Sequence, residues 1–83
     1  MHPGQFLDTR CLKPLRLTQL ALAEALGISR RRVNELVRGK RGVSPDTAVR
    51  LAAYFRTEPE FWMQLQLAWD VHRALKSRKS PRS

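Results

Sequence analysis

The sequence contains only one cysteine, Cys11, among its 83 residues, and only two histidines, His2 and His72. A single cysteine cannot form an internal disulfide, and the three residues are too scattered for a metal site, so we expect no disulfide, metal or cofactor. Apolar residues do not run on for the roughly 20 positions that a membrane-spanning helix needs, and no apolar run of signal-peptide length follows Met1. We therefore expect a cytoplasmic protein without a membrane partner.

Acidic residues are scarce as well. Seven Asp and Glu stand against 16 Lys and Arg, which gives a formal net charge of +9. The excess is uneven, because six basic residues lie between Arg30 and Arg41 with Glu35 as the only acid, and five more lie between Arg73 and Arg82 with none. Such clustering predicts a polyanionic partner, nucleic acid before anionic membrane. For the second cluster, a solubilising tail is the alternative.

Combinations of residues that support catalysis are missing. The sequence offers no plausible Ser/His/Asp or Cys/His set, no paired carboxylates and no glycine-rich phosphate loop, since its four glycines stand singly. Cys11 is better explained as a small core residue than as a nucleophile. We therefore expect that the protein is not an enzyme.

The sequence does contain regularly spaced helix boundaries, and it has no strand pattern. Apolar spacing predicts helices at 5–13, 19–26, 30–38 and 45–55, and a last one from 59 to 75 or 76. Pro14 is expected to interrupt the first helix. The pattern predicts an all-α domain over residues 1–76 with a C-terminal dimerisation helix, followed by a disordered basic tail, 77–83.

Capping residues define most of these boundaries. Thr18, Ser29 and Ser44 are good N-caps, and Gly27 is suited to the left-handed geometry that closes a helix. The segment Thr57–Glu60 is predicted to form a capping box with a proline in the first turn.

Residues 18–39 have the layout of a helix-turn-helix, in which a tight turn at Gly27 joins two short helices. An α-helix fits the major groove of B-DNA, where arginine pairs with guanine and asparagine with adenine. Three successive arginines at the positive end of a helix dipole also point to a nearby anion. Glu35 is placed either to orient Arg31 or to accept from a cytosine amine. Phosphate contacts are expected from Thr18, Gln19, Ser29, Arg38, Lys40 and Arg41.

The segment LTQLALAEALGISRRRVNELVRGKRGVSPDTAVRLAAYF closely resembles the lambda-repressor-like (Xre, or Cro/CI) helix-turn-helix family. The flanking HPGQFL, LKPL and EFWMQLQLAWDV resemble the HigA antitoxin group within it, also labelled VapI, so the resemblance covers residues 2 to about 74. Arg16 departs from the pattern, because a glycine is usual at that position.

The resemblance implies a five-helix fold, homodimers that bind palindromic operators, and repression of the antitoxin's own operon. It also implies a protein partner, a HigB-like ribosome-dependent mRNA interferase toxin, and a location in the cytoplasm at the nucleoid. By the same resemblance, the residues that contact bases are Arg30, Arg31 and Asn34, with Arg32 beside them.

Residues 61–71 hold more apolar side chains than one face of a helix can bury. We expect the surplus to form a dimer interface that contains Phe61, Trp62, Leu65 and Trp69; burial within the monomer is the alternative. Twofold symmetry would then place two recognition helices about 34 Å apart, one turn of DNA.

Two other functions remain open at this point. One is a stand-alone Xre/Cro-like transcriptional repressor with no toxin partner. The other is RNA binding, which is disfavoured because the basic segment around Arg30 has no exposed aromatic residues for base stacking.

Overall fold

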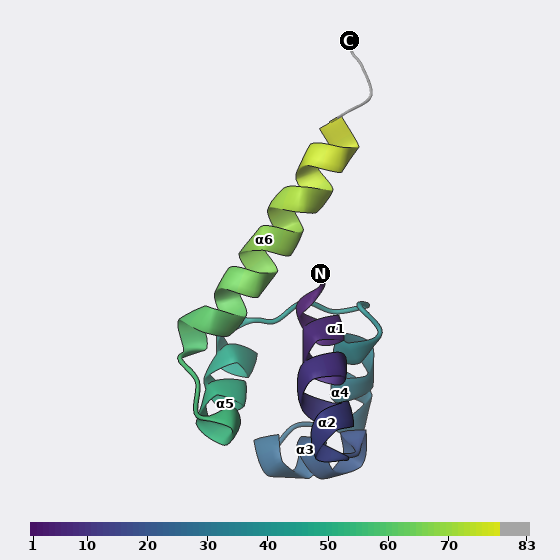
Figure 1. Cartoon of the computed structure of the whole chain (residues 1–83), viewed down its shortest axis with the longest axis vertical. Helices are drawn as coiled ribbons and strands as arrows, with labels where there is room; N and C mark the ends of the chain where they lie inside the picture. The colour runs from purple at the N-terminus through teal and green to yellow at the C-terminus, as the bar shows by residue number, and fades with distance from the viewer. Residues whose placement is uncertain (79–83) are drawn as a thin grey trace.

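The computed structural model describes residues 1–78, and every regular element in that range is a helix (Figure 1). The elements are α1 (Pro3–Leu7), the π-helical turn η1 (Asp8–Leu12), α2 (Lys13–Leu15), α3 (Gln19–Leu26), α4 (Arg30–Val37), α5 (Pro45–Phe55) and α6 (Pro59–Arg78). Because α1, η1 and α2 follow one another without a break, the described chain forms five helical rods, and the predicted all-α five-helix fold is confirmed. None of these helices is long and apolar enough to cross a membrane.

The first helix continues past Pro14, and the prediction that proline interrupts it was wrong. A proline inside a helix lacks the N–H donor and its ring clashes with the carbonyl four residues earlier. Here the π-helical turn lies directly before it, and the Lys13 N–H donates to the Asp8 carbonyl, five residues back. The wider turn separates the backbone groups that would otherwise clash with the ring.

This first helix ends at Arg16, whose φ of 54° and ψ of 38° are left-handed. Left-handed geometry costs a side chain with a Cβ about 1 kcal/mol or more, which is why glycine is favoured at such a position. The departure noted in the sequence therefore has a local energetic cost.

We expect Arg16→Gly to raise the free energy of unfolding by about 0.5 to 1 kcal/mol, because relief of the left-handed strain exceeds the entropy that glycine adds to the unfolded chain. Urea denaturation followed by circular dichroism measures the change. Arg38→Gly is the matched control: Arg38 ends α4 with a negative φ of −82°, so glycine relieves no strain there and the variant should lose stability. A lower free energy of unfolding for Arg16→Gly would contradict the claim that the left-handed backbone at Arg16 is strained.

The three predicted N-caps are confirmed. Each hydroxyl oxygen accepts a hydrogen bond from the backbone N–H three residues later. Thr18 accepts from Ala21 at 3.0 Å, Ser29 from Arg32 at 3.1 Å and Ser44 from Thr47 at 3.3 Å. The prediction of a capping box at Thr57–Glu60 was wrong, because the Thr57 hydroxyl does not cap α6. The Thr57 hydroxyl instead accepts from the Trp62 indole Nε1 at 2.8 Å, so it satisfies a donor that burial would otherwise leave unpaired.

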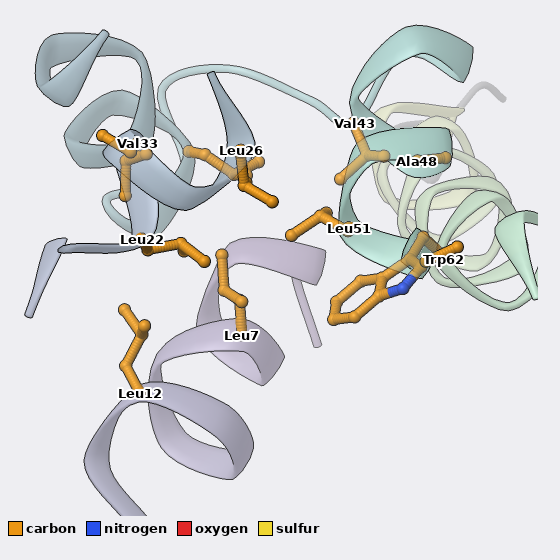
Figure 2. Packing of buried hydrophobic residues seen from close by; sticks show 12 residues of the cluster. Leu7, Leu12, Leu22, Leu26, Val33, Val43, Ala48, Leu51 and Trp62 are labelled. Carbon is orange, nitrogen blue, oxygen red and sulfur yellow. The ribbon is translucent and has the colours of Figure 1, made fainter. Parts of the chain in front are cut away.

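The core lies where the first helix, α3, α4, α5 and the start of α6 meet (Figure 2). Trp62 is 1% exposed and contacts Phe6 and Phe55 with ring centroids 5.8 and 6.0 Å apart. The expectation that Trp62 lies in a dimer interface therefore does not hold, because the monomer itself encloses the indole. Cys11 is half-buried against this core, and burial raises the pKa of its thiol.

Helix α6 is longer than the sequence predicted. It continues through Ser77 and Arg78, which were expected to belong to the disordered tail, and the rest of that tail, 79–83, lies outside the described residues. Figure 1 shows α6 extending well beyond the other helices. Its apolar residues Leu67, Val71 and Leu75 are exposed and recur every fourth position, so they form one stripe, called here the α6 stripe.

The start of the chain is anchored by His2. Its Nδ1 accepts a hydrogen bond from the Gly4 N–H at 2.8 Å, and the imidazole contacts the Trp69 ring edge-on with centroids 5.3 Å apart. Burial lowers the pKa of His2 below its ordinary value of 6.5; Asp70 opposes this shift, and Arg73 adds to it. The neutral imidazole is therefore the form that fits the folded protein.

We expect the free energy of unfolding to fall as the pH drops below about 6.5, because the unfolded chain then protonates His2 while the folded chain resists. His2→Asn should flatten this part of the pH dependence, since asparagine still accepts from Gly4 but does not titrate. Urea denaturation at about pH 7.5 and about pH 5.5 tests this, with His72→Asn at the exposed part of α6 as the control. An unchanged pH dependence in His2→Asn would contradict it.

Candidate nucleic-acid interface

Helices α3 and α4 are joined by a turn of three residues, Gly27, Ile28 and Ser29. Gly27 has a φ of 73°, which ends α3 and reverses the chain. Ile28 packs against the core, and Ser29 caps α4. The two helices that the sequence identified as a helix-turn-helix are therefore adjacent in space, and Ile28 anchors the turn between them to the core.

One side of α4 is buried and the other is basic, as predicted. Val33 and Leu36 belong to the core and Val37 packs beside it. On the opposite side Arg30 is exposed, and the Arg31 side chain is 87% exposed. The first turn of α4 thus presents two guanidinium groups to the surroundings, the arrangement that a major-groove contact needs.

Arg32 lies differently from its two neighbours. Its Nη2 donates to the Thr47 hydroxyl at 3.0 Å and lies 3.4 Å from an Asp46 carboxylate oxygen, both at the start of α5. The structure therefore places the Arg32 side chain apart from Arg30 and Arg31, against the start of α5. One step of 100° around the helix turns the side chain from the exposed side toward α5.

Asn34 connects the two helices of the motif. Its Nδ2 donates to the Gln19 Oε1 at 3.1 Å, so both amides are oriented. Together with Thr18, Leu20 and Arg30 they line a shallow hollow of about 560 Å³ between the start of α3 and the outer side of α4. Leu20, an exposed apolar residue, was not among the predicted site residues.

Glu35 is paired with two arginines. It accepts from Arg31 Nε at 3.2 Å and from Arg41 Nη2 at 2.9 Å. The pKa of Glu35 is lowered most by the hydrogen bond from Arg41. The hydrogen bond from Arg31 lowers it further. Of the two roles left open by the sequence, this geometry supports the orientation of Arg31, and it adds a contact with the loop that the sequence did not reveal.

The loop after α4 carries the remaining basic residues. Arg38, Lys40 and Arg41 are exposed there. The loop is held from α6, because the Gln66 Oε1 accepts from the Val43 N–H at 2.7 Å. Gln66 is thus a positioning residue that sequence reasoning missed, since its partner lies 23 residues away and no local pattern links them.

Thr18 and Ser29 both stand at helix N-termini on this side of the molecule. Each hydroxyl oxygen accepts a capping bond, which leaves its O–H group able to donate to an anion. Within residues 1–78, no cluster of three or more His, Cys, Asp or Glu side chains could hold a metal ion.

Comparisons with known proteins agree with this geometry. A family model described as "Helix-turn-helix" matches residues 10–62. The chain is 42% identical over 80 residues to virulence-associated protein I of Dichelobacter nodosus. The alignment covers 96% of this chain and 74% of that protein. It is 40% identical over 68 residues to antitoxin HigA-1 of Vibrio cholerae, and that alignment covers 82% of this chain and 64% of that protein.

A solved structure shares the fold. It is described as Pseudomonas aeruginosa antitoxin HigA with the higBA promoter, and it aligns with a TM-score of 0.90 at 40% identity over 93% of this chain and 84% of that chain.

Proposed function

The chain belongs to the helix-turn-helix family, and from this premise we propose that it is a sequence-specific DNA-binding antitoxin. It represses its own operon as a dimer, and it neutralises a HigB-like mRNA interferase. The observation that carries the DNA-binding part is the outer side of α4, where the exposed Arg30 and Arg31 lie beside the oriented Asn34. A cytoplasmic location at the nucleoid follows from this function.

In this proposal α4 lies in the major groove. Arg30 and Arg31 contact guanine edges, and Asn34 contacts adenine while Gln19 holds its amide. Phosphates on either side are bound by Thr18, Gln19 and Ser29 at the helix N-termini, and by Arg38, Lys40 and Arg41 in the loop. The phosphate contacts set the register of α4, and the base contacts supply the preference for one sequence.

The α6 stripe is the surface that we propose for dimerisation. Leu67, Val71 and Leu75 are exposed at helical spacing, and a second copy of the same helix offers a matching apolar surface. Of the other predicted interface residues, Phe61 and Leu65 lie earlier in α6, whereas Trp69 lies on another side of the helix, where its ring contacts His2. A twofold axis at α6 would present two copies of α4 to a palindromic operator.

We expect the wild-type chain to sediment as a dimer at micromolar concentration and Val71→Glu to sediment as a monomer, because a carboxylate within the α6 stripe would be buried without a partner. Ser77→Glu is the matched control, since Ser77 lies with Trp69 and Arg73 on another side of α6 and should leave the dimer intact. A monomeric wild-type chain, or a dimeric Val71→Glu variant, would contradict this interface.

Toxin neutralisation rests on the similarity to proteins named as antitoxins. A stand-alone repressor without a toxin is the second candidate, because the basic side of α4 accounts for DNA binding alone. Co-expression with the neighbouring genes separates the two. Co-purification with a small basic protein encoded beside it, followed by loss of that protein's ribosome-dependent mRNA cleavage, is the result expected of an antitoxin. Purification without any such partner supports the stand-alone repressor.

A further inference from the structure

We propose that Asp46, at the start of α5, is a positioning residue for DNA recognition, because its carboxylate joins the recognition helix α4 to the C-terminus of α3. Three helices meet at this carboxylate through the side chains of Arg32 and Arg50. The proposal rests on the function proposed above, and it assigns Asp46 no contact with DNA.

On the α4 side, the link is Arg32. Its Nη2 lies 3.4 Å from the Asp46 Oδ2 and donates to the neighbouring Thr47 hydroxyl at 3.0 Å. The Arg32 side chain is only 31% exposed, and its Nε is buried without a hydrogen-bond partner among the described residues. The Arg32 guanidinium is therefore partly buried and bound to the start of α5.

On the α3 side, the link is Arg50. Its Nε donates to the same Asp46 Oδ2 at 2.9 Å, and its Nη1 donates to the Leu26 carbonyl at 2.8 Å. Leu26 is the last residue of α3, and its carbonyl has no partner within the helix. A positive group at this end also interacts favourably with the helix dipole. Arg50 thus covers the turn at Gly27 from outside.

One carboxylate oxygen therefore holds both sides of the helix-turn-helix. A shift of α4 relative to α3 would lengthen either the Arg32 or the Arg50 contact, and α4 carries Arg30 and Arg31 in the turn that contains Arg32. The hydrogen bond from Arg50 is the largest cause of a lowered pKa at Asp46, so the carboxylate stays ionised well into acid. Because Asp46 is 60% exposed, its ion pairs add little to global stability, and its role is orientation.

Asp46→Asn tests the proposal, because positioning and simple electrostatics predict opposite signs. Removal of a negative charge near a DNA-binding surface should by itself tighten binding to every duplex. The positioning role predicts that affinity for the promoter duplex falls about tenfold while affinity for a random duplex is unchanged or rises. Glu60→Gln is the matched control, since Glu60 also follows an N-terminal proline, in α6, and it should leave the promoter preference intact.

Arg50→Lys provides a second variant with no change in charge. Lysine has a single nitrogen in place of Nε and Nη1, which bond Asp46 and Leu26, so the preference for promoter over random duplex should fall as it does in Asp46→Asn. A loss of folded protein alone would weaken both duplexes equally. Circular dichroism confirms the folded fraction at the temperature used.

A double-mutant cycle distinguishes an indirect role of Arg32 from a base contact. If Arg32 acts through Asp46, the addition of Asp46→Asn to Arg32→Ala should cost much less than Asp46→Asn alone. Additive losses would overturn the proposal, and so would an Asp46→Asn variant that keeps the full promoter preference. A wild-type chain without any promoter preference would instead overturn the proposed function.

Discussion

Gly4→Ala is expected to lower the free energy of unfolding by about 3 kcal/mol, which is most of the stability available to a chain of this length. A Cβ at Gly4 would lie 1.7 Å from the Leu36 carbonyl oxygen and 2.6 Å from its carbon. Both atoms belong to the backbone of α4, so no side-chain rotation can relieve the overlap. Helix α1 would have to move away from the buried side of the recognition helix.

The sign of this effect is informative, because alanine is intrinsically favoured over glycine within a helix by about 1 kcal/mol. Urea denaturation of the purified variant measures the loss. Gly42→Ala is the matched control: its added Cβ would meet only the end of the Gln66 side chain at 2.9 Å, which can shift, so the loss should be smaller. A Gly4→Ala variant as stable as the wild type would contradict the close packing of α1 on α4.

Arg31→Ala is expected to cost about 1 to 3 kcal/mol of promoter binding and to relax the sequence preference at one base pair in each half-site. The Arg31 side chain is almost fully exposed and is oriented by Glu35, so its removal leaves the fold intact while it deletes a base contact. Titration of fluorescent duplexes that carry each base change in turn measures both the affinity and the preference.

Lys40→Ala is the matched comparison for Arg31→Ala. Both variants lose one positive charge, but Lys40 lies in the loop after α4 and is proposed to bind phosphate. Its removal should weaken promoter and random duplexes alike and reduce the dependence of log affinity on log salt by about 0.9. Equal losses on promoter and random DNA for Arg31→Ala would show that Arg31 binds phosphate and does not contact bases.

Local chemistry made the helices predictable from the sequence. Thr18, Ser29 and Ser44 cap their helices with bonds that involve residues only three positions away, and Gly27 takes the left-handed conformation that few other residues tolerate. The sequence could not show how Pro14 is accommodated, because the π-helical turn before it depends on backbone widening. The end of α6 was placed short of Arg78 because no apolar residue follows Leu75, so apolar spacing gives no sign of the last helical turn.

The candidate site was predictable where one helix presents its own residues, as at Arg30 and Arg31. It was less predictable where the partner comes from elsewhere in the chain. Arg32 lies on the flank of α4, and helical spacing alone cannot decide between solvent and α5. The surplus of apolar residues in α6 likewise gave no indication that Trp62 packs inside the monomer while Val71 stays exposed.

The central claim is that the exposed side of α4, with Arg30, Arg31 and Asn34, binds one DNA sequence in the major groove. It is tested most directly by a titration of the wild-type chain with its own promoter duplex and with a scrambled duplex of equal length, at low and at physiological salt. We expect the promoter to bind at least about 10³-fold more tightly, with both affinities falling as salt rises. Equal affinity for the two duplexes, or no binding to the promoter at low salt, would contradict the claim.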